Sequence, residues 1–295
     1  MIVISLASLA VVACASANKS ALKEASAVSA RSFAAGDYAE AIGLHRDLYA
    51  KAPGNGAVLA SYVATVEDVK RAGDGARGRG NYVAAEGAYR ALIAGWDGIS
   101  AFAGKLTFKR ADIEASLRDC RVARCEREFQ KELRAGDPAK ALGAYLAGFK
   151  QYPGDKSLRA AYARSVSEIR AIGAKALTAK DFALAGKING LLLGNIASVE
   201  ALGGPAERGA ADTRELTEAL RVCASGLTNR GLAEYRKGDL EKAIATWSDL
   251  LTFDPGNAEI KKAVETAKAQ LARLRSSAPG KGSGRSGRKG QQPAR

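Results

Sequence analysis

A chain of 295 residues in which 47% of the residues are hydrophobic can bury one large core or two smaller ones, which excludes a wholly disordered protein. Aromatic residues make up only 6% of the chain and alanine is abundant, which favours helices that pack closely through small side chains. The formal net charge of +14 makes polyanions a class of partner to consider. We therefore expect an all-α fold with a basic surface.

The first 17 residues, MIVISLASLAVVACASA, carry no charge and are followed by Asn18 and Lys19. This length suits the apolar region of a secretory signal and is short for a membrane-spanning helix. We therefore expect an exported protein with a signal peptide over residues 1–17.

Within this segment, Val11-Val12-Ala13-Cys14 resembles the bacterial lipobox, and the resemblance implies that the Cys14 thiol receives a lipid. Two alternatives stay open. Ordinary signal peptidase could cleave after Ala15-Ser16-Ala17 and release a soluble protein that begins at Asn18. An uncleaved or non-secreted N-terminal helix is the other alternative, since no Lys or Arg precedes the apolar run.

Three segments of the chain, 34–55, 134–155 and 236–257, align without a gap. Each has a Gly-Asp pair, then an amphipathic stretch of about 15 residues, and then a Pro-Gly pair, which are turn, helix and terminator signals in that order. They share an alanine at Ala41, Ala141 and Ala243. We expect each segment to form the second helix of a helix pair.

Two weaker copies, 79–98 and 179–198, keep the turn, an aromatic residue and an alanine but lack the proline. The register extends backwards, because 58–76 aligns with 158–176. A duplication of about 100 residues is the simplest account of this spacing.

The last strong copy resembles the tetratricopeptide repeat over 224–257. The residues on the family's favoured positions, or next to them, are Gly231, Tyr235, Gly238, Ala243, Trp247, Leu251 and Pro255. The resemblance implies an α-solenoid of about five helix pairs, three clear and two degenerate, in a repeat domain over residues 18–275.

The stretch KRAGDGARGRGNY, residues 70–82, contains Gly73-x-Gly75-x-x-Gly78, which is the spacing of a dinucleotide-binding loop. Such a loop joins a strand to the N-terminus of a helix, and no strand pattern precedes the glycines here. We therefore assign them to a loosened helix and an inter-helix turn, and expect no nucleotide there.

Residue types that carry catalysis are scarce. His45 is the only histidine, and it occupies the place that Tyr145 and Trp247 hold in the other strong copies, which indicates a packing role. Glu126 and Glu128 are interpreted as solvated helix residues with arginines nearby, and we expect no acid in an apolar setting that would raise its pKa. The sequence therefore predicts no enzyme, no cofactor and no metal site.

Three cysteines follow Cys14 in the chain. Cys120 and Cys223 stand in the related contexts LRDC and LRVC and are expected to be mostly buried. Cys120 and Cys125 would pair poorly on one helix because side chains five residues apart point in different directions. A bridge from Cys223 to either of them stays open.

In the tetratricopeptide family, the first helix of each pair lines a concave groove that takes extended or helical peptides. Counting back from each turn glycine places one set of residues in that groove: Lys70, Arg77, Arg134, Arg170, Tyr235 and Arg236. Guanidinium groups make bidentate bonds with phosphate or carboxylate, so an acidic peptide would suit this set. The alternative is that these are ordinary solvated basic residues, and the asparagines of the family's carboxylate clamp are not found at the matching positions.

The last segment, 276–295, is rich in Gly and Ser and contains no acid. Its basic residues are Lys281, Arg285, Arg288, Lys289 and Arg295. Such a composition cannot bury a core. We expect a disordered basic tail that either contacts a polyanion or only solvates the chain.

These features predict a non-catalytic scaffold for assembly or secretion proteins in the bacterial cell envelope. Cys14 is not followed by the aspartate that retains some lipoproteins in the inner membrane, so the lipobox resemblance implies the inner leaflet of the outer membrane, facing the periplasm. Its partners would be other envelope proteins or peptides, and the lipid anchor would hold it at the membrane. The alternative is a soluble periplasmic or secreted cationic protein that binds acidic glycan or nucleic acid through its groove and tail. Of these two polymers, we do not expect nucleic acid in an exported protein.

Overall fold

The structure is a computed structural model that describes residues 20, 22–201 and 209–277. All regular elements among these residues are helical, so the expected all-α fold is confirmed. The predicted signal peptide, with Cys14, and residues 278–295 of the predicted tail lie outside the described residues.

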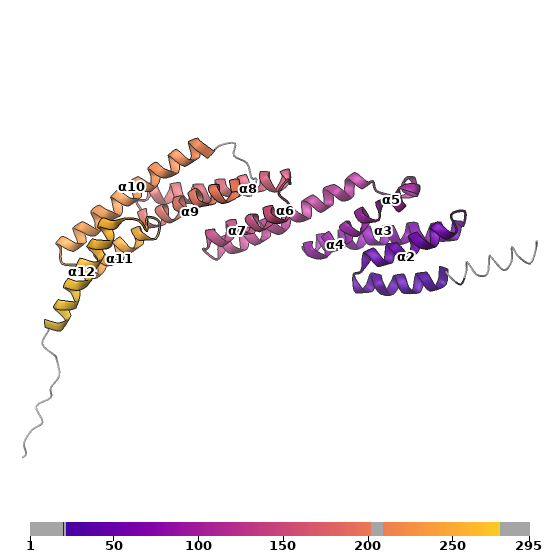
Figure 1. Cartoon of the computed structure of the whole chain (residues 1–295), viewed down its shortest axis with the longest axis horizontal. Helices are drawn as coiled ribbons and strands as arrows, with labels where there is room; N and C mark the ends of the chain where they lie inside the picture. Colours follow the sequence, from indigo (N-terminus) through magenta and orange to yellow (C-terminus); the bar gives the residue numbers. More distant parts are fainter. Residues whose placement is uncertain (1–19, 21, 202–208, 278–295) are drawn as a thin grey trace, which may run out of the picture. The chain divides into compact units, whose positions relative to one another are not determined.

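The chain divides into two compact units, and the boundary lies inside one helix. In the first unit, a helical stretch at 22–35 is followed by α2 (Tyr38–Lys51), α3 (Gly56–Gly78), α4 (Tyr82–Ala94), α5 (Trp96–Ile99), the 3-10 helix η1 (Ser100–Lys105), α6 (Arg110–Arg134), α7 (Pro138–Gln151) and the start of α8 (Lys156–Thr178) (Figure 1). The second unit begins at Val166 within α8 and continues with α9 (Phe182–Ala201), α10 (Gly209–Arg236), α11 (Leu240–Leu251) and α12 (Ala258–Ser277). No described helix is long and apolar enough to cross a membrane.

The same turn joins two helices at five places in the described chain. At each place one residue has φ between 58° and 84°, and these residues are Gly36, Gly80, Gly136, Lys180 and Gly238. The amide of the next residue donates to the carbonyl five residues before it, with N···O distances of 2.8–3.0 Å, which is a Schellman ending of the first helix. Glycine suits this left-handed backbone because it has no Cβ to clash with the chain. We call each helix–turn–helix a hairpin.

The residue after the left-handed position begins the second helix of each hairpin. Asp37, Asn81, Asp137 and Asp181 each accept a hydrogen bond from the backbone amide three residues later, at 2.9–3.2 Å. This bond satisfies an amide that has no partner inside the helix. The Gly-Asp signals of the sequence are therefore a helix ending followed directly by a helix start.

Small residues bring the two helices of a hairpin together. The alanine five residues after the left-handed position is fully buried in every hairpin, at Ala41, Ala85, Ala141, Ala185 and Ala243. Glycines in the first helix allow a closer approach still. A Cβ at Gly73 would lie 2.8 Å from Tyr89, and one at Gly231 would lie 2.3 Å from Nε1 of Trp247, so a larger residue at either position would collide with the second helix.

Helix bounds recur at the spacing that the sequence predicts. The helices α2 and α7 begin and end 100 residues apart, and so do α3 and α8. The run of glycines at 73–78 lies inside α3, and the turn follows at Gly80. The assignment of this run to a helix and a turn is therefore confirmed, and no strand precedes it among the described residues.

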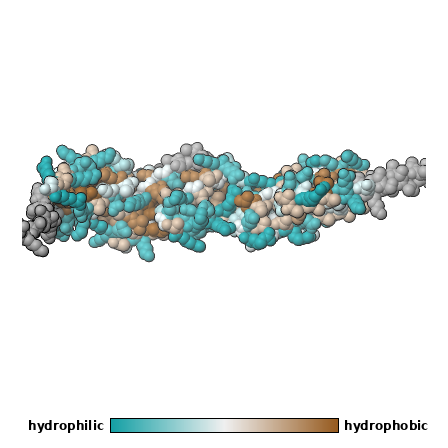
Figure 2. Space-filling model, turned by 90° about the horizontal axis from the view of Figure 1, so that it is seen from below, coloured by the Kyte–Doolittle hydropathy of each residue, from teal (hydrophilic) through white to brown (hydrophobic). Residues whose placement is uncertain are grey.

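Each unit has its own hydrophobic core. In the first unit, the sequence between α4 and α6 contributes aromatic residues that the repeat pattern does not predict, and the Phe102 ring lies 4.7 Å from the ring of Tyr62. In the second unit, Trp247 packs with Leu227 and Val264. Figure 2 shows hydrophilic side chains over much of the visible face, with hydrophobic residues gathered in patches between them.

Candidate functional site

The expected groove residues of α3 make contacts within the first unit. The Nζ of Lys70 lies 2.5 Å from Oδ2 of Asp74 and 5.8 Å from the centre of the Phe108 ring. An Nη of Arg77 lies 3.7 Å from an Asp119 oxygen. Both basic side chains therefore face acids of their own unit.

The other expected groove residues lie in both units. Arg134 is exposed at the end of α6 in the first unit, and Arg236 is exposed at the end of α10 in the second. In the second unit, Arg170 lies 3.6 Å from Glu215, and the Tyr235 hydroxyl donates to Gln270 at 2.7 Å. A role of these residues in ligand binding stays a prediction.

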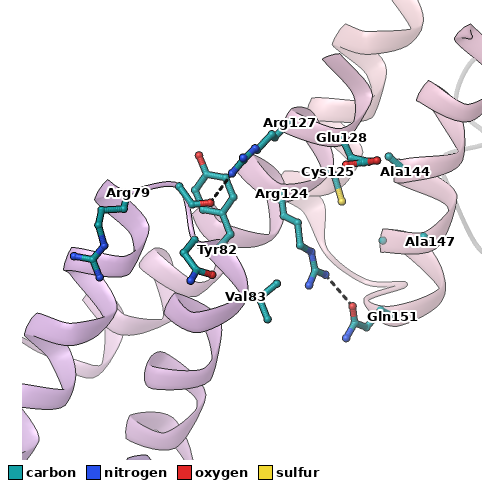
Figure 3. Close-up of a pocket in the computed structure, with 13 residues that line it drawn as sticks. Arg79, Tyr82, Val83, Arg124, Cys125, Arg127, Glu128, Ala144, Ala147 and Gln151 are labelled. Carbon is teal, nitrogen blue, oxygen red and sulfur yellow. Dashed lines mark hydrogen bonds between the residues drawn. The ribbon is translucent and has the colours of Figure 1, made fainter. Parts of the chain in front are cut away.

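A cleft of about 740 Å³ opens between the α3–α4 turn and the α6–α7 hairpin, wholly inside the first unit (Figure 3). Its lining residues are Arg79, Gly80, Asn81, Tyr82, Val83, Arg124, Cys125, Arg127, Glu128, Ala144, Ala147, Gly148 and Gln151. We call it the hairpin cleft. A volume of this size lies within the range of small-ligand sites in proteins, about 300–1,000 Å³.

One side of the hairpin cleft is apolar. Ala144, Ala147 and Gly148 lie along α7, and Cys125 faces them from α6 (Figure 3). The Sγ of Cys125 lies 2.9 Å from the place where a Cβ of Gly148 would stand, so only glycine permits this contact between the two helices. Val83, at the start of α4, is 68% exposed, the largest exposed fraction among the large hydrophobic side chains of the described residues.

The polar side of the cleft is basic. Arg79, Arg124 and Arg127 contribute positive charge, and Glu128 is the one acid among its lining residues. Glu128 pairs with Lys131 at 2.8 Å, and the hydrogen bond from Lys131 lowers the pKa of the Glu128 carboxyl, so that acid is ionised at neutral pH. The three guanidinium groups therefore outnumber the carboxylate on this surface.

Two of these arginines are held by defined bonds, which Figure 3 marks with dashed lines. Arg127 donates to the carbonyl oxygen of Gly80 at 2.8 Å, and Arg124 donates to Oε1 of Gln151 at 2.9 Å. The bond to Gly80 ties α6 to the preceding turn. Arg230 makes the corresponding bond in the second unit, to the carbonyl of Lys180 at 3.0 Å.

A buried acid that the sequence pattern does not single out lies behind the hairpin cleft. Glu86 of α4 is 3% exposed, and its carboxylate lies 3.0 Å from Arg90 and 3.3 Å from Arg124. The Tyr152 hydroxyl donates to it at 3.3 Å. Burial of a carboxylate is tolerated because these partners surround it. The sequence does not reveal this cluster because Arg124 and Tyr152 reach Glu86 only in the folded chain.

The cluster continues from Tyr152 towards α8. The Arg121 guanidinium lies 3.9 Å from the centre of the Tyr152 ring, and Arg121 pairs with Asp155 at 3.4 Å. Arg90 also hydrogen-bonds the Tyr152 hydroxyl. These contacts join α4, α6 and the α7–α8 loop, so they fix the walls of the hairpin cleft relative to one another.

The two acids of α6 that were interpreted as solvated differ in the structure. Glu128 is exposed, as expected. Glu126 is half-buried, so it is less solvated than expected. It accepts a hydrogen bond from the Tyr145 hydroxyl at 2.6 Å. The physical reason is that Tyr145 packs between helices and needs a partner for its hydroxyl there.

His45 and the three described cysteines lie in packing positions. His45 is 1% exposed, and burial lowers the pKa of its imidazole. Cys120, Cys125 and Cys223 are buried free thiols, and burial raises the pKa of Cys120 to about 11. No group of three or more metal-ligating residues occurs in the described part of the chain.

A scan against protein-family models gives no match for the chain, and a search of curated proteins gives none either.

Proposed function

We propose that the protein is a non-catalytic scaffold of tetratricopeptide-like repeats that binds segments of other proteins in the bacterial cell envelope. The observation that carries the proposal is the recurrence of one hairpin in both units, with the same left-handed turn and the same buried alanine. Stacked hairpins bury their apolar faces against neighbours and offer extended surfaces for binding. The duplication and the solenoid arrangement belong to this proposal.

The chemistry of the described residues supports binding rather than catalysis. The histidine and the cysteines are buried among packing side chains, and the raised pKa of each thiol keeps it protonated at neutral pH. The exposed surface instead offers arginines beside small apolar residues, as in the hairpin cleft. Such a surface recognises shape and charge in a partner.

The envelope location in the proposal depends on the N-terminal sequence, and the mass of the N-terminal peptide tests it. The native protein would be isolated from its own cells after separation of membrane and soluble fractions. A diacylglyceryl group on Cys14 in the membrane fraction is the expected result. An N-terminus at Asn18 would favour the soluble exported alternative, and an intact Met1 would overturn the envelope location.

The binding role is tested by purifying the protein from the same cells without crosslinking, at low and at high salt. We expect a defined protein to remain bound at both salt concentrations, because apolar contacts inside repeat surfaces are not screened by ions. Retention of glycan or nucleic acid alone, with a steep loss on addition of salt, would overturn the scaffold and favour the polymer-binding alternative.

A further inference from the structure

We propose that the hairpin cleft binds an extended acidic peptide segment in which an aliphatic side chain lies between carboxylates, an inference that rests on the proposed scaffold function. The aliphatic side chain would contact the wall formed by Ala144, Ala147 and Gly148, and Val83 at the mouth. The carboxylates would contact the arginines of the rim.

The apolar wall of the cleft is open to solvent. Val83 exposes 68% of its surface and Ala147 is exposed, although both stand beside a concave surface. A partner's aliphatic side chain placed there would remove this apolar area from water, at about 25 cal/mol per Å². The close contact of Cys125 with Gly148 means that the wall is already formed before a partner arrives.

Two arginines of the rim have donors available for a ligand. Arg79 stands at the exposed end of α3, and Arg127 uses one guanidinium nitrogen to hold Gly80, which leaves other donors of its five N–H groups for a ligand. Arg124 is more fully engaged, with Gln151 and Glu86, so it positions the wall instead. Guanidinium groups bind carboxylates in bidentate fashion, and an acidic segment therefore complements this rim.

In the second unit, the chain's own side chains occupy the corresponding place. Gln151 and Phe253 stand at the same distance after their turn glycines, and the Phe253 ring lies against Gly186, 2.2 Å from where a Cβ would be. Ala147 corresponds to Asp249, which pairs with Lys187 at 2.9 Å. The first unit has small or polar residues at these positions and an open cleft.

The charge of the chain excludes its own last residues as the occupant. Residues 276–295 carry only basic charges, which the arginines of the hairpin cleft would repel. A partner with acidic residues is attracted both by the cleft and by the net charge of +14. Only the first of these attractions depends on the position of the arginines, and the test exploits this difference.

The test measures the fluorescence anisotropy of a labelled eight-residue peptide that alternates Glu and Leu, with the full chain and four variants. Arg79→Glu and Ala147→Asp change the hairpin cleft. Arg71→Glu on α3 and Ala139→Asp on α7 are matched controls, because they make the same changes at exposed positions outside the cleft lining. Thermal melting of each variant establishes that it is folded.

We expect the two cleft variants to weaken peptide binding by at least about tenfold. Arg79→Glu places a carboxylate where the ligand's own carboxylates lie, and Ala147→Asp places a charge against the ligand's aliphatic side chain. The controls should stay within about twofold of the parent chain, since they change the overall charge and, in Arg71→Glu, one exposed ion pair with Asp68, all outside the cleft lining. A version of the peptide with Ser in place of Leu should bind about tenfold more weakly, because it lacks the apolar contact.

Three results would overturn the proposal. The first is no binding of the Glu–Leu peptide. The second is an equal loss in the cleft variants and the controls, which would indicate attraction by net charge alone. The third is tighter binding of an oligonucleotide than of the Glu–Leu peptide, with that binding lost in the cleft variants. This result would make the cleft a nucleic-acid site. If a partner protein co-purifies from cells with Arg79→Glu as well as with the parent chain, the scaffold stands and only the cleft assignment fails.

Discussion

At the scale of single residues, one glycine decides how closely two helices of a hairpin approach. A Cβ at Gly231 would lie 2.3 Å from Nε1 of Trp247, and this tryptophan is 4% exposed in the second core. We expect Gly231→Ala to lower the free energy of unfolding by about 1–3 kcal/mol, because the ring cannot move without losing its packing. Urea unfolding followed by circular dichroism measures the change.

Gly87 offers a matched control for that substitution. It is an exposed glycine inside α4, and nothing lies within 4 Å of a Cβ placed there. Gly87→Ala should raise stability by about 0.5–1 kcal/mol through helix propensity alone. If Gly231→Ala raised stability to the same extent, that result would contradict the close approach of Gly231 to Trp247.

A second prediction at this scale concerns the buried carboxylate of Glu86. The variant Glu86→Gln keeps the shape of the side chain but removes the charge that pairs with Arg90 and Arg124. We expect a loss of about 1–3 kcal/mol, below the value for a fully buried pair because both arginines are partly exposed. Glu128→Gln, at an exposed ion pair, should leave the urea midpoint unchanged. Equal effects of the two variants would argue against the buried cluster.

At the scale of elements, the turn of each hairpin can be tested by exchanging residues between copies. Lys180 is the one described non-glycine residue with a positive φ, at 58°, whereas Gly136 holds the same place with φ 79°. Lys180→Gly should raise the free energy of unfolding by up to about 1 kcal/mol, because it relieves left-handed strain that exceeds the added freedom of the unfolded chain.

The reverse exchange should have the opposite sign. Gly136→Ala puts a Cβ on a left-handed residue and should lower stability by about 1–2 kcal/mol. No neighbouring atom lies within 4 Å of that Cβ, so the effect would come from the backbone rather than from crowding. Thermal melting of Lys180→Gly and Gly136→Ala, compared with the parent chain, shows whether each variant is more or less stable. A more stable Gly136→Ala would contradict a left-handed turn at this position.

The hairpins could be predicted from sequence because their signals are local. Gly136 and Asp137 end one helix and start the next through bonds that span no more than five residues. The hairpin cleft could not be predicted in this way. Its shape depends on Glu86 meeting Arg124 and on Arg127 reaching Gly80, and these partners are brought together only when α6 packs on the preceding hairpin. The buried aromatic segment around Phe102 also falls outside the repeat, so periodicity gave no sign of it.

At the scale of the whole molecule, a deletion can remove part of the net positive charge without changing the hairpin cleft. Five of the basic charges lie within 278–295, and the hairpin cleft lies in the first unit. A chain that lacks 278–295 should keep its helix content and melting temperature, because that composition cannot contribute to a core. A lowered melting temperature would mean that the segment contacts the helices.

The same deletion separates the two proposed modes of binding. If the tail contacts a polyanion through its five basic residues, the slope of log affinity for heparin against log salt should fall in magnitude by up to about 4, since each lost contact releases one fewer counterion. The affinity for the Glu–Leu peptide should change by less than about twofold, because its carboxylates are bound by arginines of the folded first unit. Heparin titrations and peptide anisotropy at several salt concentrations measure both quantities on one preparation. A parallel loss in both would mean that the tail, rather than the hairpin cleft, attracts acidic partners.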